Sequence, residues 1–464
     1  MTIGELAPQI EAGKLSPVEL TRQVLSQIRR LQPALNAYIV VLEESALDQA
    51  RQAEREIRTG HYRGPLHGIP YAAKDLFYTK GVATTAGSKI LRDHQPGYDA
   101  AVIERLREAG AVLVGKTGLH EFAYGITNNN PHFGPVRNPW DTARIPGGSS
   151  GGSGAAQATG QCVFSLGSDT GGSVRIPASF CGIAGLKPTF GRISRYGVFP
   201  LGHSLDHVGH FASTVKDLAT ILEAIAGPDP RDDSSAREPL PPLDLPPEPS
   251  LKDYRVGVPA NYYFERCEPE VHKAAHAAIE TMRGLGAQVS EVEIADLEEF
   301  TVLGRLILLP EATAVHRHRL RTRRADIGAD VLGLLDQGQF VTACDYLDAQ
   351  RRRRQLIETL NAVFDQVDVI ITPATPITAP KIGETTVEIA GHKEDARLAA
   401  TRLVRALNLA GVPALAIPCG FDSRGLPIGL QIFGRAFDEA AVLTVGHAYE
   451  QATEWHKRRP SLAG

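Results

Sequence analysis

The sequence GGSSGGS at residues 147–153 and the sequence GSDTGGS at residues 167–173 are two glycine- and serine-rich segments that lie close together in the chain. Glycine clusters let backbone amides approach a ligand and adopt positive φ without steric cost. Serines among them can act as nucleophiles, proton carriers or helix caps. The residues between the two segments fit one helix and one short strand. We interpret this pair of loops as an active site for acyl transfer.

The composition is that of an ordinary globular protein, and it argues against several classes of function. Of the 464 residues, 43% are apolar and 22% are charged, and the formal net charge is −4. These values give no strongly basic surface, so nucleic acid is not expected as a partner. The five cysteines lie far apart without a CxxC pair, which argues against a zinc site and a disulfide framework. We expect no metal, no cofactor and a reducing compartment.

The N-terminal residues and the hydropathy pattern bear on location. Residues 1–20 carry acidic side chains and no continuous apolar core, so we do not interpret them as a signal peptide. No run of about 18 apolar residues occurs, so the sequence predicts no transmembrane helix. We therefore expect a cytoplasmic protein with no membrane partner.

Alternating helical and apolar segments predict an α/β sheet with helices on its faces. We expect helices over residues 17–31, 43–59, 99–109, 271–282 and 345–363, and strands that end at Lys74 or cover 111–115, 255–258, 288–294, 367–372, 414–418 and 428–433. Residues 226–252 are rich in proline and polar side chains and are interpreted as a surface connector. We treat residues 1–464 as one domain with N-terminal helices (1–65), a core (66–225), this connector, and a second part of the same sheet (253–464) with a helical insertion near 297–363.

Two motifs match a known pattern but lack its structural context. Residues 110–117 satisfy GxxxxGK[ST], but the four intervening residues are apolar and are expected to form a strand instead of an exposed phosphate loop. Residues 147–151 satisfy GxSxG, but the polar, proline-containing residues 140–146 before them do not form the strand that a nucleophile elbow requires. We discount nucleotide binding and the α/β-hydrolase interpretation.

Two clusters of chemically active side chains have simpler explanations. His203, His207 and His210 could share one face of a helix as metal ligands, but Gly202 and Gly209 interrupt such a helix. Hydrogen-bonded loop histidines are the expectation there. The four arginines of residues 351–354 could hold an anion, although a solvated helix face or a subunit contact is favoured.

Acyl transfer without a catalytic histidine needs a serine nucleophile, a base and backbone donors for the oxyanion. Ser173 ends the sequence TGGS, where consecutive amides can converge on one oxygen. The next residues, 174–180, are expected to begin a helix, whose N-terminus favours negative charge. A helix-capping serine after a glycine turn is the alternative for Ser173 considered alone.

The complete pattern resembles the amidase signature family. The blocks that carry this resemblance are GIPYAAKD at 68–75, GGSSGGS at 147–153, GSDTGGSVRIPA at 167–178, CGIAGLKPTFGRIS at 181–194 and GLPIGLQIFG at 425–434. Together they extend the match from about residue 5 to 453. The resemblance implies an α/β fold with a large mixed, mostly parallel central sheet covered by helices on both faces.

The resemblance also implies roles for individual residues. Ser173 matches the nucleophile, Lys74 the general base, and Ser149 the serine that relays protons after a cis peptide bond. The backbone amides that match the oxyanion hole are those of Thr170, Gly171, Gly172 and Ser173. The groups expected to brace this site are Asp169 and Arg175, with Ser150 as the rival of Ser149 for the relay.

The implied chemistry depends on an uncharged lysine. A lysine with its reference pKa of about 10.4 is protonated at pH 7 and cannot act as a base. Burial at the end of an apolar strand lowers such a pKa by roughly 3–5 units at most. A neutral Lys74 can then draw a proton from Ser149, which draws one from Ser173.

Two departures from the family's amidotransferase branch bear on the substrate. The chain shares a similar EFAYG segment (121–125) with the glutaminase subunits of tRNA-dependent amidotransferases. It has Thr401 where that pattern expects an aspartate for the amine of glutamine, and no arginine in residues 332–335 for its carboxylate. Both ends of a zwitterionic substrate would then lack a partner, which is costly in a buried site.

We therefore favour a stand-alone amidase that acts on a less charged small amide, or on a carbamate (urethane) or biuret-like compound. A glutaminase subunit is the first alternative, and an inactive binding or scaffold protein on the same fold is the second. The residues expected to line the mouth of the pocket are Tyr124, Gly125, Ile126 and Thr127, with ordinary loop packing as their alternative. A homodimer is implied by the resemblance alone.

Overall fold

The computed structural model describes residues 1–463 and contains one sheet of eleven strands in the order β1-β3-β2-β6-β8-β7-β14-β15-β11-β9-β10. The strands are β1 (Tyr38–Val41), β2 (Pro70–Lys74), β3 (Val112–Thr117), β6 (Phe164–Asp169), β7 (Ala184–Lys187), β8 (His207–Ala212), β9 (Arg255–Pro259), β10 (Gln288–Val292), β11 (Val369–Pro373), β14 (Ala414–Phe421) and β15 (Pro427–Gly434). Outside this sheet lie two short hairpins, β4 (Asn129–Asn130) with β5 (Gly134–Pro135) and β12 (Thr386–Ile389) with β13 (His392–Asp395).

The sheet is mixed, as expected. Parallel pairing joins β3, β2 and β6 in one group and β11, β9 and β10 in a second group. The strands between the two groups, β8, β7, β14 and β15, pair in antiparallel fashion. Strands β2, β3 and β6 are buried along their whole length. Strands β2 and β3 are largely apolar up to their ends, as expected of strands covered on both faces, whereas β6 also carries Ser165, Ser168 and Asp169.

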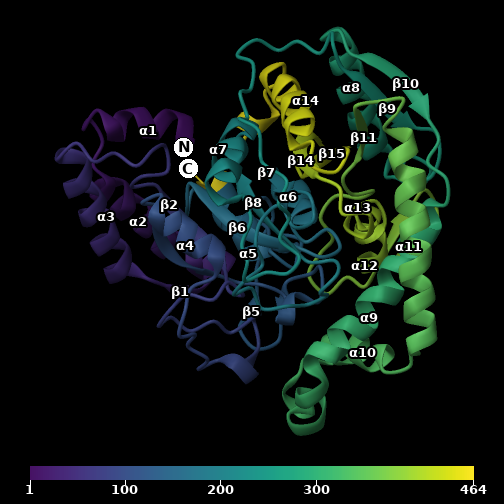
Figure 1. The fold of residues 1–464 in the computed structure, drawn as a ribbon, viewed down its shortest axis with the longest axis horizontal. Coiled ribbons are helices and arrows are strands. Elements are labelled where there is room, and N and C mark those ends of the chain that lie inside the picture. Colours follow the sequence, from purple (N-terminus) through teal and green to yellow (C-terminus); the bar gives the residue numbers. More distant parts are fainter. Residues whose placement is uncertain (464) are drawn as a thin grey trace.

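Fourteen α-helices in residues 1–463 cover the faces and one edge of the sheet (Figure 1). They are α1 (Ile3–Glu11), α2 (Pro17–Leu35), α3 (Glu43–Arg58), α4 (Ala101–Glu108), α5 (Gly151–Ala158), α6 (Arg175–Cys181), α7 (Val215–Ile225), α8 (Pro269–Gly284), α9 (Leu297–Thr322), α10 (Ala329–Gly338), α11 (Ala343–Val363), α12 (Ala396–Arg402), α13 (Arg405–Ala410) and α14 (Glu439–Gln451). The long helices α9 and α11 lie side by side at one edge of the molecule, next to α13 (Figure 1). Residues 226–252 form no helix or strand.

The two discounted motifs have the local structure that we expected. Residues 112–117 form strand β3, and Lys116 is fully buried in it, so the apparent phosphate loop is part of the sheet. No strand lies directly before residues 147–151, because residues 140–146 form a turn and one isolated bridge. His207 and His210 lie in strand β8, and Nδ1 of His207 donates to the carbonyl oxygen of Leu205 at 2.7 Å. No helix within residues 1–463 is long and apolar enough to cross a membrane.

A buried ion pair joins the segment after β7 to the C-terminal helix. Glu439 begins α14 and accepts hydrogen bonds from Arg192 Nε at 3.2 Å and from the Thr189 amide at 2.9 Å. The two charged side chains are at most 1% exposed. Burying an unpaired charge is costly, so each partner makes the other tolerable.

We expect the variant Glu439→Ala to lower the free energy of unfolding by about 3–5 kcal/mol, because it leaves the Arg192 guanidinium buried without its partner. Chemical denaturation measures this loss. The control is Arg51→Ala, which removes an exposed pair with Asp48 and should leave the denaturation midpoint unchanged. Equal midpoints for Glu439→Ala and the unmodified protein would contradict the prediction.

Candidate active site

The two glycine- and serine-rich loops lie at the ends of the elements that were expected between them. Helix α5 begins at Gly151, within the first segment, β6 ends at Asp169, within the second segment, and α6 begins at Arg175 after it. The peptide bond between Gly148 and Ser149 is cis. Gly172 has φ +113°, and a Cβ there would lie 2.3 Å from Val404 Cγ2, so only glycine fits this turn.

Lys74 ends strand β2 and is fully buried beside the first loop. Its Nζ lies 2.7 Å from Ser149 Oγ, 2.9 Å from Ser150 Oγ and 2.8 Å from Ser168 Oγ. Burial lowers the pKa of the Lys74 amine to about 7, although the charges of Asp169 and Asp206 act in the opposite direction. A substantial fraction of this amine is therefore uncharged at neutral pH.

The hydrogen bonds around Lys74 restrict the directions of its protons. The Ser150 hydroxyl donates to the carbonyl oxygen of Ser168 at 3.1 Å, so Ser150 Oγ acts towards Lys74 only as an acceptor. A neutral amine has two N–H donors and one lone pair, and three hydroxyls surround it here. Its lone pair is then available to the hydroxyl of Ser149 or Ser168, which can donate a proton to it.

Ser168 is a contact of Lys74 that our interpretation of the sequence missed. It lies in β6, next to Asp169, and its amide also donates to Ser150 Oγ at 3.2 Å. Its position in the GSD sequence that begins the second segment could have indicated this contact. Side chains alternate across a strand, so a residue beside Asp169 faces the opposite side of the sheet from it.

Asp169 and Arg175 form a fully buried ion pair behind the second loop. The Asp169 carboxylate accepts from Arg175 Nη2 at 3.0 Å and from the amides of Gly172 at 2.8 Å and Val174 at 3.0 Å. Burial by itself would raise the pKa of Asp169, but the charge and hydrogen bonds of Arg175, with further contributions from Lys187 and Asn408, hold it below its usual range. The carboxylate is therefore ionised, and it fixes the shape of the loop.

Gly172 is a correction to the expected set of oxyanion donors. Its amide donates to Asp169 Oδ1 at 2.8 Å, so this N–H is already used within the protein. Within residues 1–463, the amides of Thr170, Gly171 and Ser173 donate to no protein atom. Thr170 is held in place by its hydroxyl, which donates to the buried carboxylate of Asp206 at 2.6 Å.

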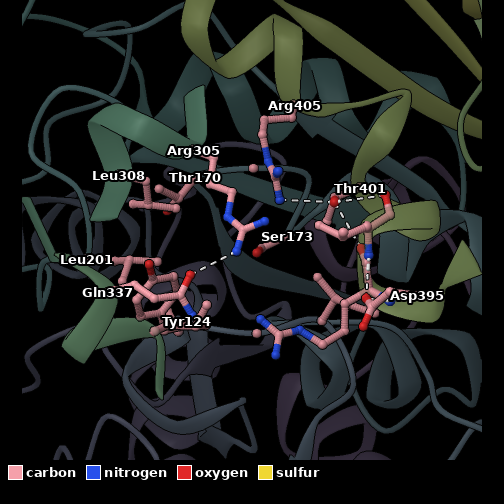
Figure 2. A pocket seen from close by; sticks show the side chains of 17 residues that line it. Tyr124, Thr170, Ser173, Leu201, Arg305, Leu308, Gln337, Asp395, Thr401 and Arg405 are labelled. Carbon is pink, nitrogen blue, oxygen red and sulfur yellow. Dashed lines mark hydrogen bonds between the residues drawn. The ribbon is translucent and has the colours of Figure 1, made fainter. Parts of the chain in front are cut away.

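A pocket of about 200 Å³ opens in front of Ser173 (Figure 2). Its lining includes Thr170, Gly171 and Ser173 from the second loop, and Tyr124, Gly125 and Ile126 from the segment that we expected at its mouth. Thr127 does not line the pocket. Its hydroxyl instead lies 3.4 Å from His120 Nδ1 and accepts from the Asn129 amide at 3.3 Å, so its role is to shape the loop.

Three arginines of the pocket are a second group that we missed. Arg305 comes from α9, Arg397 from α12 and Arg405 from α13. Residues 332–335 do lack an arginine, but the conclusion that no arginine is available to a carboxylate was wrong, because these helices supply three. Arg405 Nη2 donates to Thr401 Oγ1 at 3.0 Å (Figure 2).

The comparisons with known proteins extend over the whole chain. One subunit of the glutamyl-tRNA(Gln) amidotransferase of Chloroflexus aggregans is 42% identical, over 100% of this chain and 98% of that protein. A solved structure of an unexpected vestigial protein complex that reveals the evolutionary origins of an s-triazine catabolic enzyme is 38% identical, with a TM-score of 0.93 over 97% of this chain and 98% of that one. A solved amidase is 36% identical, with a TM-score of 0.89 over 97% and 99%. The model of the family described as Amidase matches residues 19–443, and the chain therefore belongs to the amidase family.

Proposed function

We propose that the protein hydrolyses the C–N bond of a small amide through an acyl-enzyme on Ser173, with Ser149 and Lys74 as a proton relay. The observation that carries this proposal is the environment of the Lys74 amine. It is fully buried, it lies 2.7 Å from Ser149 Oγ, and it forms no ion pair with any carboxylate within residues 1–463. A buried lysine without a counter-ion is suited to act as a base.

The first half of the reaction forms the acyl-enzyme. Neutral Lys74 accepts the Ser149 proton as Ser149 accepts that of Ser173, and Ser173 Oγ attacks the carbonyl carbon. The amides of Thr170, Gly171 and Ser173 donate to the oxyanion of the tetrahedral intermediate. The relay then returns the proton to the leaving nitrogen, and the amine departs.

The second half repeats these steps with water. A water molecule loses its proton to the relay, attacks the acyl carbon and releases the acid, and Ser173 regains its hydrogen. The same steps apply to the carbonyl carbon of carbamates and biuret-like compounds. Asp169 and Arg175 hold the second loop in position, since their side chains are fully buried and form an ion pair with each other.

A glutaminase subunit of a tRNA-dependent amidotransferase is the second candidate, and the relatives favour it over the stand-alone amidase that we expected. The specific observation is the 42% identity to the glutamyl-tRNA(Gln) amidotransferase subunit over the full chain. The inactive-scaffold alternative is not supported, because Lys74 and Ser149 lie within hydrogen-bonding distance and Ser173 lines the pocket.

Amine release by the purified chain separates the two candidates. The substrates are L-glutamine, uncharged aryl and aliphatic amides, biuret and aryl carbamates. Turnover of substrates other than glutamine by the chain alone supports a stand-alone amidase. Turnover restricted to glutamine supports the glutaminase subunit, and partner subunits should then be sought.

We expect Ser173→Ala to lower kcat/KM by at least about 10⁴-fold and Ser149→Ala by about 10²- to 10⁴-fold, because the first removes the nucleophile and the second interrupts the relay. Mass spectrometry of the protein mixed with substrate should show an acyl adduct that is absent from Ser173→Ala. Ser165→Ala, in the same strand as Ser168 but bonded to the Ser153 carbonyl, is the matched control and should retain activity. Undiminished turnover by Ser173→Ala would refute the mechanism.

The pH profile provides an independent test of Lys74. Because burial lowers the pKa of Lys74 to about 7 and only the neutral amine accepts a proton, kcat/KM should rise about tenfold per pH unit below pH 7 and level off above it. Lys74→Arg should be inactive at every pH, since arginine stays protonated in proteins. A rise that continues to about pH 10 would show that Lys74 has an ordinary pKa.

A further inference from the structure

The pocket in front of Ser173 contains three arginines that lack acidic partners. Arg305, Arg397 and Arg405 form no ion pair with a carboxylate in the part of the chain that the structure describes, residues 1–463. Arg305 donates to the amide oxygen of Gln337 at 3.0 Å, and Arg405 donates to the Thr401 hydroxyl at 3.0 Å. Both side chains point into the space around Ser173 (Figure 2).

Two fully buried arginines of this protein have carboxylate partners, whereas the three pocket arginines are partly exposed. Arg175 pairs with Asp169 at 3.0 Å, and Arg192 pairs with Glu439 at 3.1 Å. Arg405 differs from them, because its Nε is buried and has no hydrogen-bond partner within residues 1–463. Burial, together with the charges of Arg305 and Arg397, lowers the pKa of Arg405 to about 10, although the nearby tyrosines act in the opposite direction. The three charges therefore act on one another across the pocket.

The acidic side chains of the pocket do not balance this charge. Asp395 is the one acidic residue in the lining, and its Oδ1 accepts from the backbone amides of Arg397 and Leu398 at 2.9 Å. Asp395 thus caps helix α12. The pocket lining therefore contains three guanidinium groups and one carboxylate. An unsatisfied buried guanidinium is costly, and a bound anion with two oxygens would satisfy it in a planar, bidentate contact.

Thr401 makes the same pocket unfavourable for an ammonium group. Its hydroxyl accepts from Arg405 and lies 2.9 Å from the carbonyl oxygen of Arg397, to which it donates. The hydroxyl of Thr401 is therefore in direct contact with a cation. A substrate ammonium at this position would meet a like charge at short range, which is destabilising in a partly desolvated site.

We propose that the substrate is the monoamide of a dicarboxylic acid that carries a carboxylate and no ammonium group, with its amide carbonyl at Ser173 and its carboxylate on Arg405 and Arg305. This inference rests on the amide hydrolysis proposed above. It also distinguishes the stand-alone amidase from the glutaminase subunit, because L-glutamine differs from glutaramate only by its α-ammonium group.

Three amides of matched chain length test the inference. Glutaramate has the carboxylate alone, L-glutamine adds the ammonium group, and pentanamide replaces the carboxylate by a methyl group. We expect kcat/KM for glutaramate to exceed that for either of the others by about 10- to 100-fold. Equal or better turnover of pentanamide or L-glutamine would overturn the inference and leave the amidase chemistry intact.

Variants assign the preference to the arginines. Arg405→Gln and Arg305→Gln should each lower kcat/KM for glutaramate about tenfold or more and change kcat/KM for pentanamide far less. The ratio of kcat/KM for glutaramate to kcat/KM for pentanamide should therefore fall toward one. Arg351→Gln is the control, because Arg351 lies on α11 and pairs only with the exposed Asp348. An unchanged ratio in both pocket variants would contradict the proposed carboxylate site.

Binding separates failure of this inference from failure of the catalytic proposal. Glutarate, the expected product, should bind to Ser173→Ala in calorimetry, and Arg405→Gln introduced into that background should weaken the binding about tenfold or more. Glutarate binding without glutaramate turnover in the unmodified protein would retain the carboxylate site and refute the hydrolysis. Absence of glutarate binding in a folded Ser173→Ala protein would overturn the carboxylate site.

Discussion

The buried pair of Asp169 and Arg175 is the interaction on which the rest of the site depends. Arg175 begins helix α6, and besides Asp169 it donates to the carbonyl oxygen of Val404 at 2.8 Å, to Gln431 Oε1 at 2.8 Å and to Asn408 Oδ1 at 2.6 Å. One guanidinium thereby joins the end of β6 to α13 and β15. Asp169 in turn holds the amides of the glycine loop that carries Ser173, so the loop is positioned by the core and not by its own sequence.

The same region holds a second buried basic side chain, Lys74, which has no carboxylate partner within residues 1–463. Arg175 pairs with a carboxylate at 3.0 Å, whereas within residues 1–463 the hydrogen-bond partners of Lys74 Nζ are the hydroxyls of Ser149, Ser150 and Ser168. Buried charges persist where they are paired and hydrogen-bonded, and an amine without a counter-ion loses its proton more readily. The protein thus places a permanent charge and a titratable amine close together, and the difference lies in their partners. Structural support by Arg175 and the proton transfer that we propose for Lys74 therefore involve separate groups.

The parts of this site that could be predicted from the sequence lie within short segments. Strand β2 ends at Lys74 because an apolar run stops there, and the spacing of Ser149 and Ser173 is a local pattern that one helix and one strand preserve. The use of the Gly172 amide by Asp169 could not be predicted, because it depends on the detailed turn of the loop. Arg305, Arg397 and Arg405 come from three helices far from the signature segments, and only tertiary packing brings them to Ser173.

This division within the chain has a consequence for specificity. The proposed relay comes from residues 74–173, while the arginines of the pocket come from residues 305–405, on α9 at the edge of the molecule and on α12 and α13 beside it (Figure 1). Substitution of the arginine side chains can alter the charge in front of Ser173 and leave the loop in place, because Arg175 is bonded to α13 through Val404 and Asn408 and not through Arg405. Sequence identity to relatives over the full chain therefore indicates mainly a shared fold and the type of reaction that this fold supports. We infer that the choice of substrate depends on the few side chains that α9, α12 and α13 direct into the pocket.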